Sequence, residues 1–147
     1  MLVYKKIYNT NSTQLIIVFQ SADINNSLAN AIESNNTDQV KYEFFGLSKN
    51  IDFNNSSFLY IIDKSCNWYQ TCIADIYNLI MKEKQKFQTV FTIGISMGGY
   101  AAILFGHAMK ATGIIAFSPQ TNIEKQFAEN FILLSNEQPS SLYFTNH

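Results

Sequence analysis

The chain has 147 residues, of which 47% are hydrophobic, 14% aromatic and 14% charged. This balance predicts one soluble globular domain over residues 1–147 and excludes an intrinsically disordered chain. The net charge is −1 and arginine is absent, so we expect no nucleic-acid partner. The longest apolar runs have the length of strands and residues 1–8 lack the apolar core of a signal peptide, which predicts a cytoplasmic protein without a membrane partner.

The first third of the chain alternates apolar runs with polar stretches. Residues 2–8 alternate enough to predict an outer strand, and the continuous apolar run at 15–19 is typical of a central parallel strand. We expect a short helix over 25–34, a strand over 40–45 and a surface loop in the Asn- and Ser-rich stretch 48–57.

The rest of the chain repeats a strand followed by a helix. Residues 69–84 place apolar side chains at helical spacing and end in lysines, which predicts an amphipathic helix. The other expected elements are strands over 58–62, 87–93, 113–117 and 142–145, and helices over 100–109 and 123–133. This alternation predicts an α/β fold with a mostly parallel sheet, helices on both faces, and a ligand site beyond the carboxyl ends of the strands.

Ser96 stands between two glycines where a predicted strand meets a predicted helix. The segment Gly94-Ile95-Ser96-Met97-Gly98 has the G-x-S-x-G pattern of a nucleophile elbow. Glycines at both positions let strand and helix approach closely, and the serine oxygen would then stand above the carboxyl end of the strand. The same pattern also occurs in small-residue turns that let a helix pack on a sheet, but the strand before and the helix after favour the elbow.

Four segments together resemble the α/β-hydrolase superfamily: residues 58–63, the triplet 67–69, the elbow 94–100 and residues 115–120. The segments flanking the elbow are similar to bacterial members that are often found among surface-glycan genes. The resemblance implies a serine esterase or lipase-like enzyme that acts on a small-molecule or glycan ester and needs no cofactor. The chain is shorter than a complete member, so we expect the last strand of that fold to be absent.

An acyl-transfer serine needs hydrogen-bond donors for the oxyanion that forms on the attacked carbonyl. One expected donor is the backbone N–H of Met97, directly after Ser96. The resemblance implies a second donor in the loop after residue 20, at Ser21 or its neighbour Ala22. Ser21 is equally well explained as a polar residue of a turn.

The serine also needs a base, which the resemblance places on a histidine after the final strand. His107 is eleven residues from Ser96 along the predicted helix, about 16 Å, and is therefore too far away. His147 follows the predicted strand 142–145 and is the candidate base, although a terminal position also favours fraying. Glu124 is a more distant candidate for the acid.

Further pocket residues are expected at the ends of other predicted strands. Ser118 and Gln120 follow the strand beside the elbow, and we expect them to touch the substrate. Asp63 closes another strand, where it would shape the cleft or cap the next helix. Trp68 and Tyr69 would either wall the pocket or pack over the sheet.

The two cysteines, Cys66 and Cys72, are six residues apart in a chain without a secretion signal. We therefore expect reduced thiols rather than a disulfide, with Cys72 packed on a helix. No cluster of histidine and cysteine has the spacing of metal ligands, so no metal site is predicted.

These observations lead to a serine hydrolase of the esterase or acyl-transfer type that uses Ser96 as its nucleophile. One alternative is a catalytically incomplete, hydrolase-like binding module. Another is a truncated enzyme whose strand 142–145 lies at an open sheet edge and pairs with a second copy to form a homodimer. The presence of Ser96 favours the first reading, and the missing segment beyond His147 favours the other two.

Overall fold

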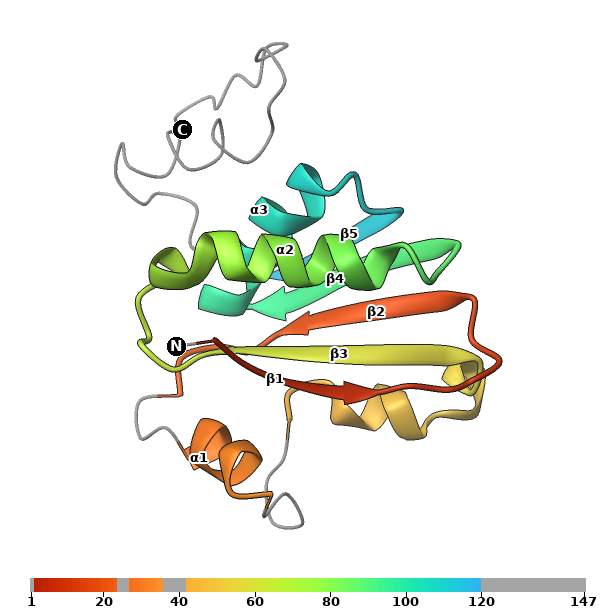
Figure 1. Ribbon diagram of the computed structural model, residues 1–147, viewed down its shortest axis with the longest axis horizontal. Coiled ribbons are helices and arrows are strands. Elements are labelled where there is room, and N and C mark those ends of the chain that lie inside the picture. The colour runs from red at the N-terminus through yellow and green to blue at the C-terminus, as the bar shows by residue number, and fades with distance from the viewer. Residues whose placement is uncertain (1, 24–26, 36–41, 120–147) are drawn as a thin grey trace, which may run out of the picture.

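The computed structural model describes residues 2–23, 27–35 and 42–119 (Figure 1). The described strands are β1 (Leu2–Ile7), β2 (Gln14–Phe19), β3 (Ser56–Asp63), β4 (Thr89–Ile95) and β5 (Gly113–Phe117). The described helices are α1 (Ser27–Glu33), α2 (Ile73–Lys84) and α3 (Met97–Ala108), with short 3-10 helices η1 (Phe45–Lys49), η2 (Ile51–Phe53) and η3 (Gln70–Cys72).

The five described strands form one sheet in the order β1-β3-β2-β4-β5. β1 runs antiparallel to β3, and the other neighbouring pairs are parallel. The expected mostly parallel sheet, with the first strand at an edge and the 15–19 run at its centre, is confirmed. Phe19 lies opposite both Ile61 and Gly94, so the carboxyl ends of β2, β3 and β4 meet at the same edge of the sheet.

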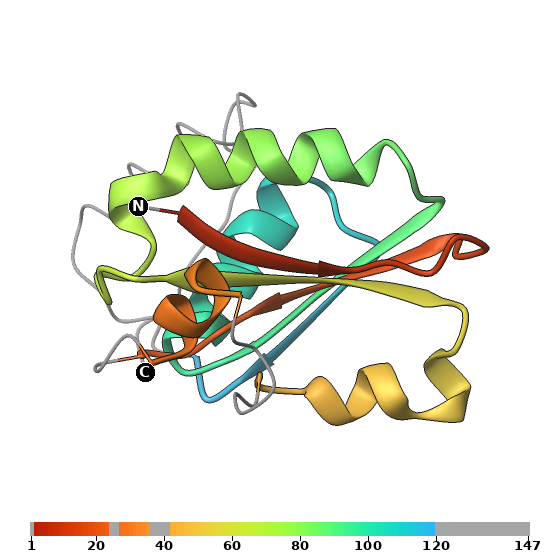
Figure 2. The ribbon, with the colours of Figure 1, turned by 60° about the horizontal axis from the view of Figure 1, so that its bottom comes forward.

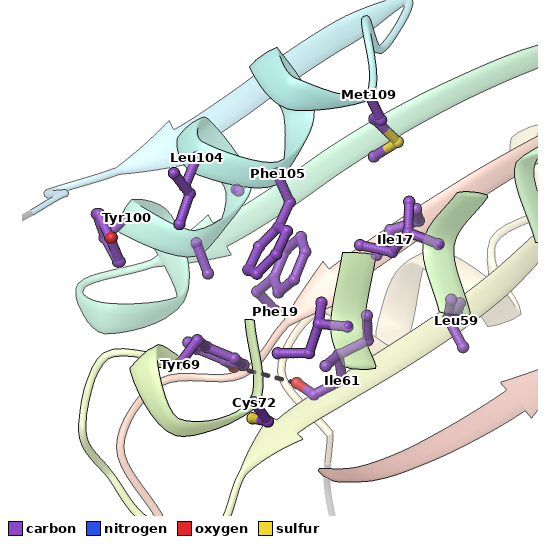
Figure 3. Packing of buried hydrophobic residues seen from close by; sticks show 14 of the residues in the cluster. Ile17, Phe19, Leu59, Ile61, Tyr69, Cys72, Tyr100, Leu104, Phe105 and Met109 are labelled. Atoms are coloured by element: carbon purple, nitrogen blue, oxygen red, sulfur yellow. Dashed lines mark hydrogen bonds between the residues drawn. The ribbon is translucent and has the colours of Figure 1, made fainter. Parts of the chain in front are cut away.

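Two apolar clusters cover the two faces of the sheet, because successive side chains of a strand point to opposite sides. On one face Ile17 and Phe19 pack against α2 and α3, and the Phe19 ring stacks on Phe105 with 5.3 Å between ring centroids (Figure 3). On the other face Val18 packs in a cluster with Leu28 of α1 and with η1. Figure 2 shows helices on both sides of the strands, as the sequence predicts.

A buried carboxylate ties the end of α2 to the edge strand β1. The side chain of Glu83 is fully buried, and its oxygens accept hydrogen bonds of 2.7 Å from Lys6 Nζ, Lys86 Nζ and the Tyr8 hydroxyl. Burial by itself raises the pKa of Glu83, but the bonds from these three donors outweigh it and lower the pKa to about 2. The ionised carboxylate therefore holds helix and strand together at neutral pH.

The strand predicted over 40–45 is wrong for the residues that the structure describes. Residues 42–45 form a turn that leads into η1, whereas 40–41 lie outside the described residues. Phe44 has a left-handed φ of 57°, which a strand cannot accommodate. The aromatic side chains that suggested a strand instead pack on the sheet, with the Tyr42 ring centroid 4.8 Å from that of Tyr60.

The other predicted elements of the described residues are present with small shifts of their ends. β4 continues to Ile95, and α3 begins at Met97. The predicted loop 48–57 contains η2 and the first residues of β3. The helix predicted over 123–133 and the strand predicted over 142–145, on which the homodimer expectation rests, lie outside the described residues.

Candidate functional site

Ser96 is the single residue between the end of β4 and the start of α3. Its φ of 52° and ψ of −119° form a backbone conformation that residues other than glycine rarely adopt. Its N–H donates to the carbonyl oxygen of Phe117 at 2.9 Å, and its carbonyl oxygen accepts the N–H of Tyr100 at 3.0 Å. The sharp strand-to-helix turn expected at Ser96 is therefore present, and neighbouring backbone holds it in place.

The two glycines of the motif are required by the close approach of three backbone segments. A Cβ atom at Gly94 would lie 2.2 Å from the carbonyl oxygen of Gly98 in the first turn of α3. A Cβ atom at Gly98 would lie 2.1 Å from the carbonyl oxygen of Phe19 at the end of β2. Both distances fall below 3.0 Å, a separation that real Cβ atoms essentially never show, so any side chain at these positions would push the segments apart.

Met97 opens α3, and the helix leaves the N–H groups of its first turn without an intrahelical acceptor. Its side chain is 2% exposed and packs in the core with α2 and α3. The half-buried Ser96 precedes it directly. Backbone N–H groups with the positive end of the helix dipole thus stand next to the serine, an arrangement suited to a negatively charged oxygen.

The peptide group that joins Gln20 to Ser21 forms the neighbouring part of the site, at the end of β2. The hydroxyl of Tyr69 lies 2.6 Å from the Gln20 carbonyl oxygen. It also lies 3.1 Å from the carbonyl oxygen of Ile61, the contact that Figure 3 draws. The Ser21 N–H donates to Oε2 of Glu43 at 3.0 Å, and the Ser21 hydroxyl donates to Oε1 of the same carboxylate. The N–H that was expected to bind the oxyanion therefore already holds a carboxylate of this chain.

The side chain of Gln20 adds a polar group beside this peptide. It is 2% exposed, and its Oε1 accepts the backbone N–H of Glu43 at 2.8 Å. Its Nε2 is buried and has no hydrogen-bond partner among the residues that the structure describes. A buried amide donor without a partner costs free energy, so apolar packing alone does not account for Gln20 at this position.

Asp63 organises the loop that carries Tyr69. Its buried carboxylate accepts backbone N–H groups from Ser65 at 2.9 Å and from Asn67 and Tyr69 at 2.8 Å each. Trp68 and Tyr69 have left-handed φ values of 64° and 63°, which the bonds to Asp63 help to stabilise. These three N–H groups all precede η3, so Asp63 binds the loop before the helix and does not cap the helix itself.

Burial and a neighbouring carboxylate also determine the protonation state of the Tyr69 phenol. Its side chain is fully buried, and burial, together with the charge of Asp63, raises the pKa of its phenol well above the usual value. The hydroxyl therefore remains protonated and keeps its capacity to donate to the Gln20 carbonyl.

Aromatic pairs flank the elbow on two sides. Trp68 meets Tyr100 edge to face, with 6.1 Å between ring centroids, and also packs against the core, which is the second of its two expected roles. Phe44 stacks on Phe117 at 5.7 Å. Phe117 is 47% exposed, which leaves an apolar surface beside the N–H of Ser96.

The structure places the other predicted site residues as follows. Ser118 is exposed directly after Phe117, the residue that accepts the Ser96 N–H. His107 is exposed in the last turn of α3, and the continuous helix separates it from Ser96 by about 16 Å. Gln120 and the candidate base His147 lie outside the described residues, as does Glu124.

Glu43 is the site residue that sequence reasoning missed. It lies 22 positions from Ser21, in a segment for which a strand was predicted. No local motif marks it, because its role depends on where its turn lies against the end of β2.

No protein-family model matches the chain, and no curated protein and no solved structure matches it either. Across residues 2–23, 27–35 and 42–119, no three histidine, cysteine or carboxylate side chains gather to hold a metal ion. In the same part of the chain, no helix is long and apolar enough to cross a bilayer. Cys66 and Cys72 are free thiols, and Cys72 is buried against the core as expected.

Proposed function

We propose that the chain is a cytoplasmic serine hydrolase of the α/β-hydrolase fold that cleaves an ester of a small molecule or a glycan. The observation that carries the proposal is the geometry at Ser96. A strained serine joins a central parallel strand to a buried helix, and the flanking glycines cannot bear a side chain. This is the structural context that distinguishes a nucleophile elbow from a chance G-x-S-x-G sequence.

In this mechanism the Ser96 hydroxyl attacks the ester carbonyl carbon and passes its proton to a base, for which His147 is the candidate. The carbonyl oxygen becomes an oxyanion, held by the N–H groups of Met97 and Ser21. When the tetrahedral intermediate collapses, the bond to the alcohol breaks and the alcohol leaves with the proton. Water then attacks the acyl-serine by the same route and releases the acid and the free Ser96 hydroxyl.

A second candidate is a hydrolase-like binding module without catalysis. Two observations favour it: the described histidine, His107, is too far from Ser96 to act as its base, and the Ser21 N–H is engaged by Glu43. In this case the polar groups at the end of β2 would bind a ligand without attacking it.

The two candidates differ in the reactivity of Ser96. We expect slow hydrolysis of short-chain p-nitrophenyl esters and covalent labelling by a fluorophosphonate, both abolished in Ser96→Ala. The matched control is Ser34→Ala, which removes an exposed serine hydroxyl at the end of α1. Hydrolysis that survives Ser96→Ala removes this serine from the mechanism, and labelling absent from the folded wild-type protein favours the binding module.

A base at His147 is tested by the same assay. His147→Gln should reduce ester hydrolysis by a factor on the order of 10³, because a serine without its base loses most of its nucleophilicity. His107→Gln is the control and should leave the rate unchanged. An unchanged rate in His147→Gln would assign the base to another residue.

A further inference from the structure

The Gln20–Ser21 peptide is held at both of its polar atoms. A peptide group is planar, and its C=O and N–H point in opposite directions. The Tyr69 hydroxyl binds the carbonyl oxygen at 2.6 Å, and the Glu43 carboxylate accepts the N–H at 3.0 Å. A contact that orients the carbonyl therefore also sets the direction of the N–H.

This peptide lies directly against the turn that carries Ser96. A Cβ atom at Gly98 would lie 3.0 Å from the Gln20 carbonyl carbon, so the peptide rests on the first turn of α3. The register of the sheet places Phe19 opposite Gly94, two residues before Ser96. The Ser21 N–H belongs to the same peptide group as the Gln20 carbonyl carbon. It is therefore the backbone donor directly next to the contact between the end of β2 and the first turn of α3.

The group that occupies this donor is a carboxylate of the chain itself. The two carboxylate oxygens of Glu43 accept from the N–H and the hydroxyl of Ser21, and its own N–H is bound by the Gln20 side chain. Hydrogen bonds to an ionised carboxylate are stronger than those between neutral groups. An oxyanion on a bound ester would have to displace this carboxylate to reach the Ser21 N–H.

We propose that Glu43 is an internal occupant of the second oxyanion donor, which leaves when substrate binds, and that Tyr69 is the positioning residue that keeps this donor aimed. The inference rests on the proposed function and extends it, because it assigns to Glu43 and Tyr69 opposite effects on the reactivity of Ser96. Removal of the Glu43 carboxylate exposes the donor and raises the reactivity of Ser96. Removal of the Tyr69 hydroxyl frees the peptide to rotate and lowers it.

The experiment measures the second-order rate of Ser96 labelling by a fluorophosphonate, whose tetrahedral adduct places an oxygen where the oxyanion forms. Glu43→Ala should label about tenfold faster than the wild type, with Glu43→Gln in between because its amide oxygen still accepts from Ser21. Tyr69→Phe should label about tenfold more slowly, since loss of a whole oxyanion donor costs a factor of roughly 10²–10³.

Two control variants separate these effects from general ones. Glu33→Ala removes one negative charge from a partly exposed carboxylate that pairs with Lys64 at 2.8 Å, and so tests the effect of net charge. Tyr42→Phe removes a buried hydroxyl that has no hydrogen-bond partner among the described residues, and so tests the loss of a buried tyrosine oxygen. Both should label at the wild-type rate, and circular dichroism should show all variants folded.

A readout independent of reactivity is the amide proton resonance of Ser21. The bond to the carboxylate shifts it downfield in the wild type, and Glu43→Ala should move it upfield while Glu33→Ala does not. An unmoved Ser21 resonance would overturn the inference whatever the labelling rates. Labelling of Ser96 that neither Glu43→Ala nor Tyr69→Phe changes would also overturn it and leave the proposed function intact, whereas no labelling in any folded variant would remove both.

Discussion

The contact between the first turn of α3 and the end of β2 makes a strong prediction for Gly98→Ala. In an ordinary helix, alanine is favoured over glycine by about 1 kcal/mol. Here the new Cβ atom would lie 2.1 Å from the Phe19 carbonyl oxygen, and the two segments would have to separate by about 0.9 Å to reach 3.0 Å. The Cβ atom is fixed directly to the backbone of α3 and its neighbour is a backbone oxygen, so no side-chain rotation can relieve the overlap.

The expected cost lies at the upper end of the range for overpacking, about 3 kcal/mol, out of a total stability of roughly 5–15 kcal/mol. For a domain of this size that corresponds to a fall in melting temperature of about 10 °C. Urea denaturation followed by circular dichroism measures the difference in the free energy of unfolding. Ester hydrolysis should fall as well, because the displaced segment carries the Ser21 N–H.

The matched control is Gly46→Ala in η1. An added Cβ atom there would meet nothing within 4 Å, and the φ of Gly46 is not positive, so alanine fits the backbone without strain. This substitution should stabilise the protein by about 0.4–1 kcal/mol, since alanine restricts the unfolded chain. If Gly98→Ala unfolds with the same free energy as the wild type or as Gly46→Ala, the steric argument for the elbow fails.

Two further predictions concern stability. The folded pKa of Glu83 lies near 2, below the 4.5 of the unfolded chain, so its contribution is present above pH 4.5 and is lost as the pH falls through 2. In urea titrations, the free energy of unfolding of the wild type should fall by on the order of 2–3 kcal/mol across this window. Glu83→Gln should lack this contribution already at pH 7, and Glu33→Gln should behave as the wild type. Asp63→Ala should cost about 3 kcal/mol, because three backbone N–H groups lose their acceptor. A cost below 1 kcal/mol would mean that the Tyr69 loop holds its conformation without this carboxylate.

Local patterns in the sequence were sufficient for most of the described elements. The continuous apolar run at 15–19 predicted a central strand, because a strand buried on both faces needs apolar side chains at every position. The strand and helix around Ser96 were likewise predicted, since the approach of Gly94 to Gly98 lies within one short segment, although the contact of Gly98 with Phe19 at the end of β2 is long-range. Residues 42–45 were misjudged because aromatic side chains favour strands and also favour packing on a sheet, and periodicity does not separate these two uses.

The electrostatic arrangement of the site was decided by the tertiary structure. Ser21, Glu43 and Tyr69 come from three loops, and their hydrogen bonds span 22 and 49 positions of sequence. Such contacts depend on where each loop lies against the ends of the strands, and side-chain spacing along the chain carries no information about that placement. Sequence reasoning therefore located the strand-to-helix turn at Ser96, whereas the bonds from the Ser21 N–H to Glu43 and from the Tyr69 hydroxyl to the Gln20 carbonyl became visible only when the sheet brought the ends of β2 and β3 together.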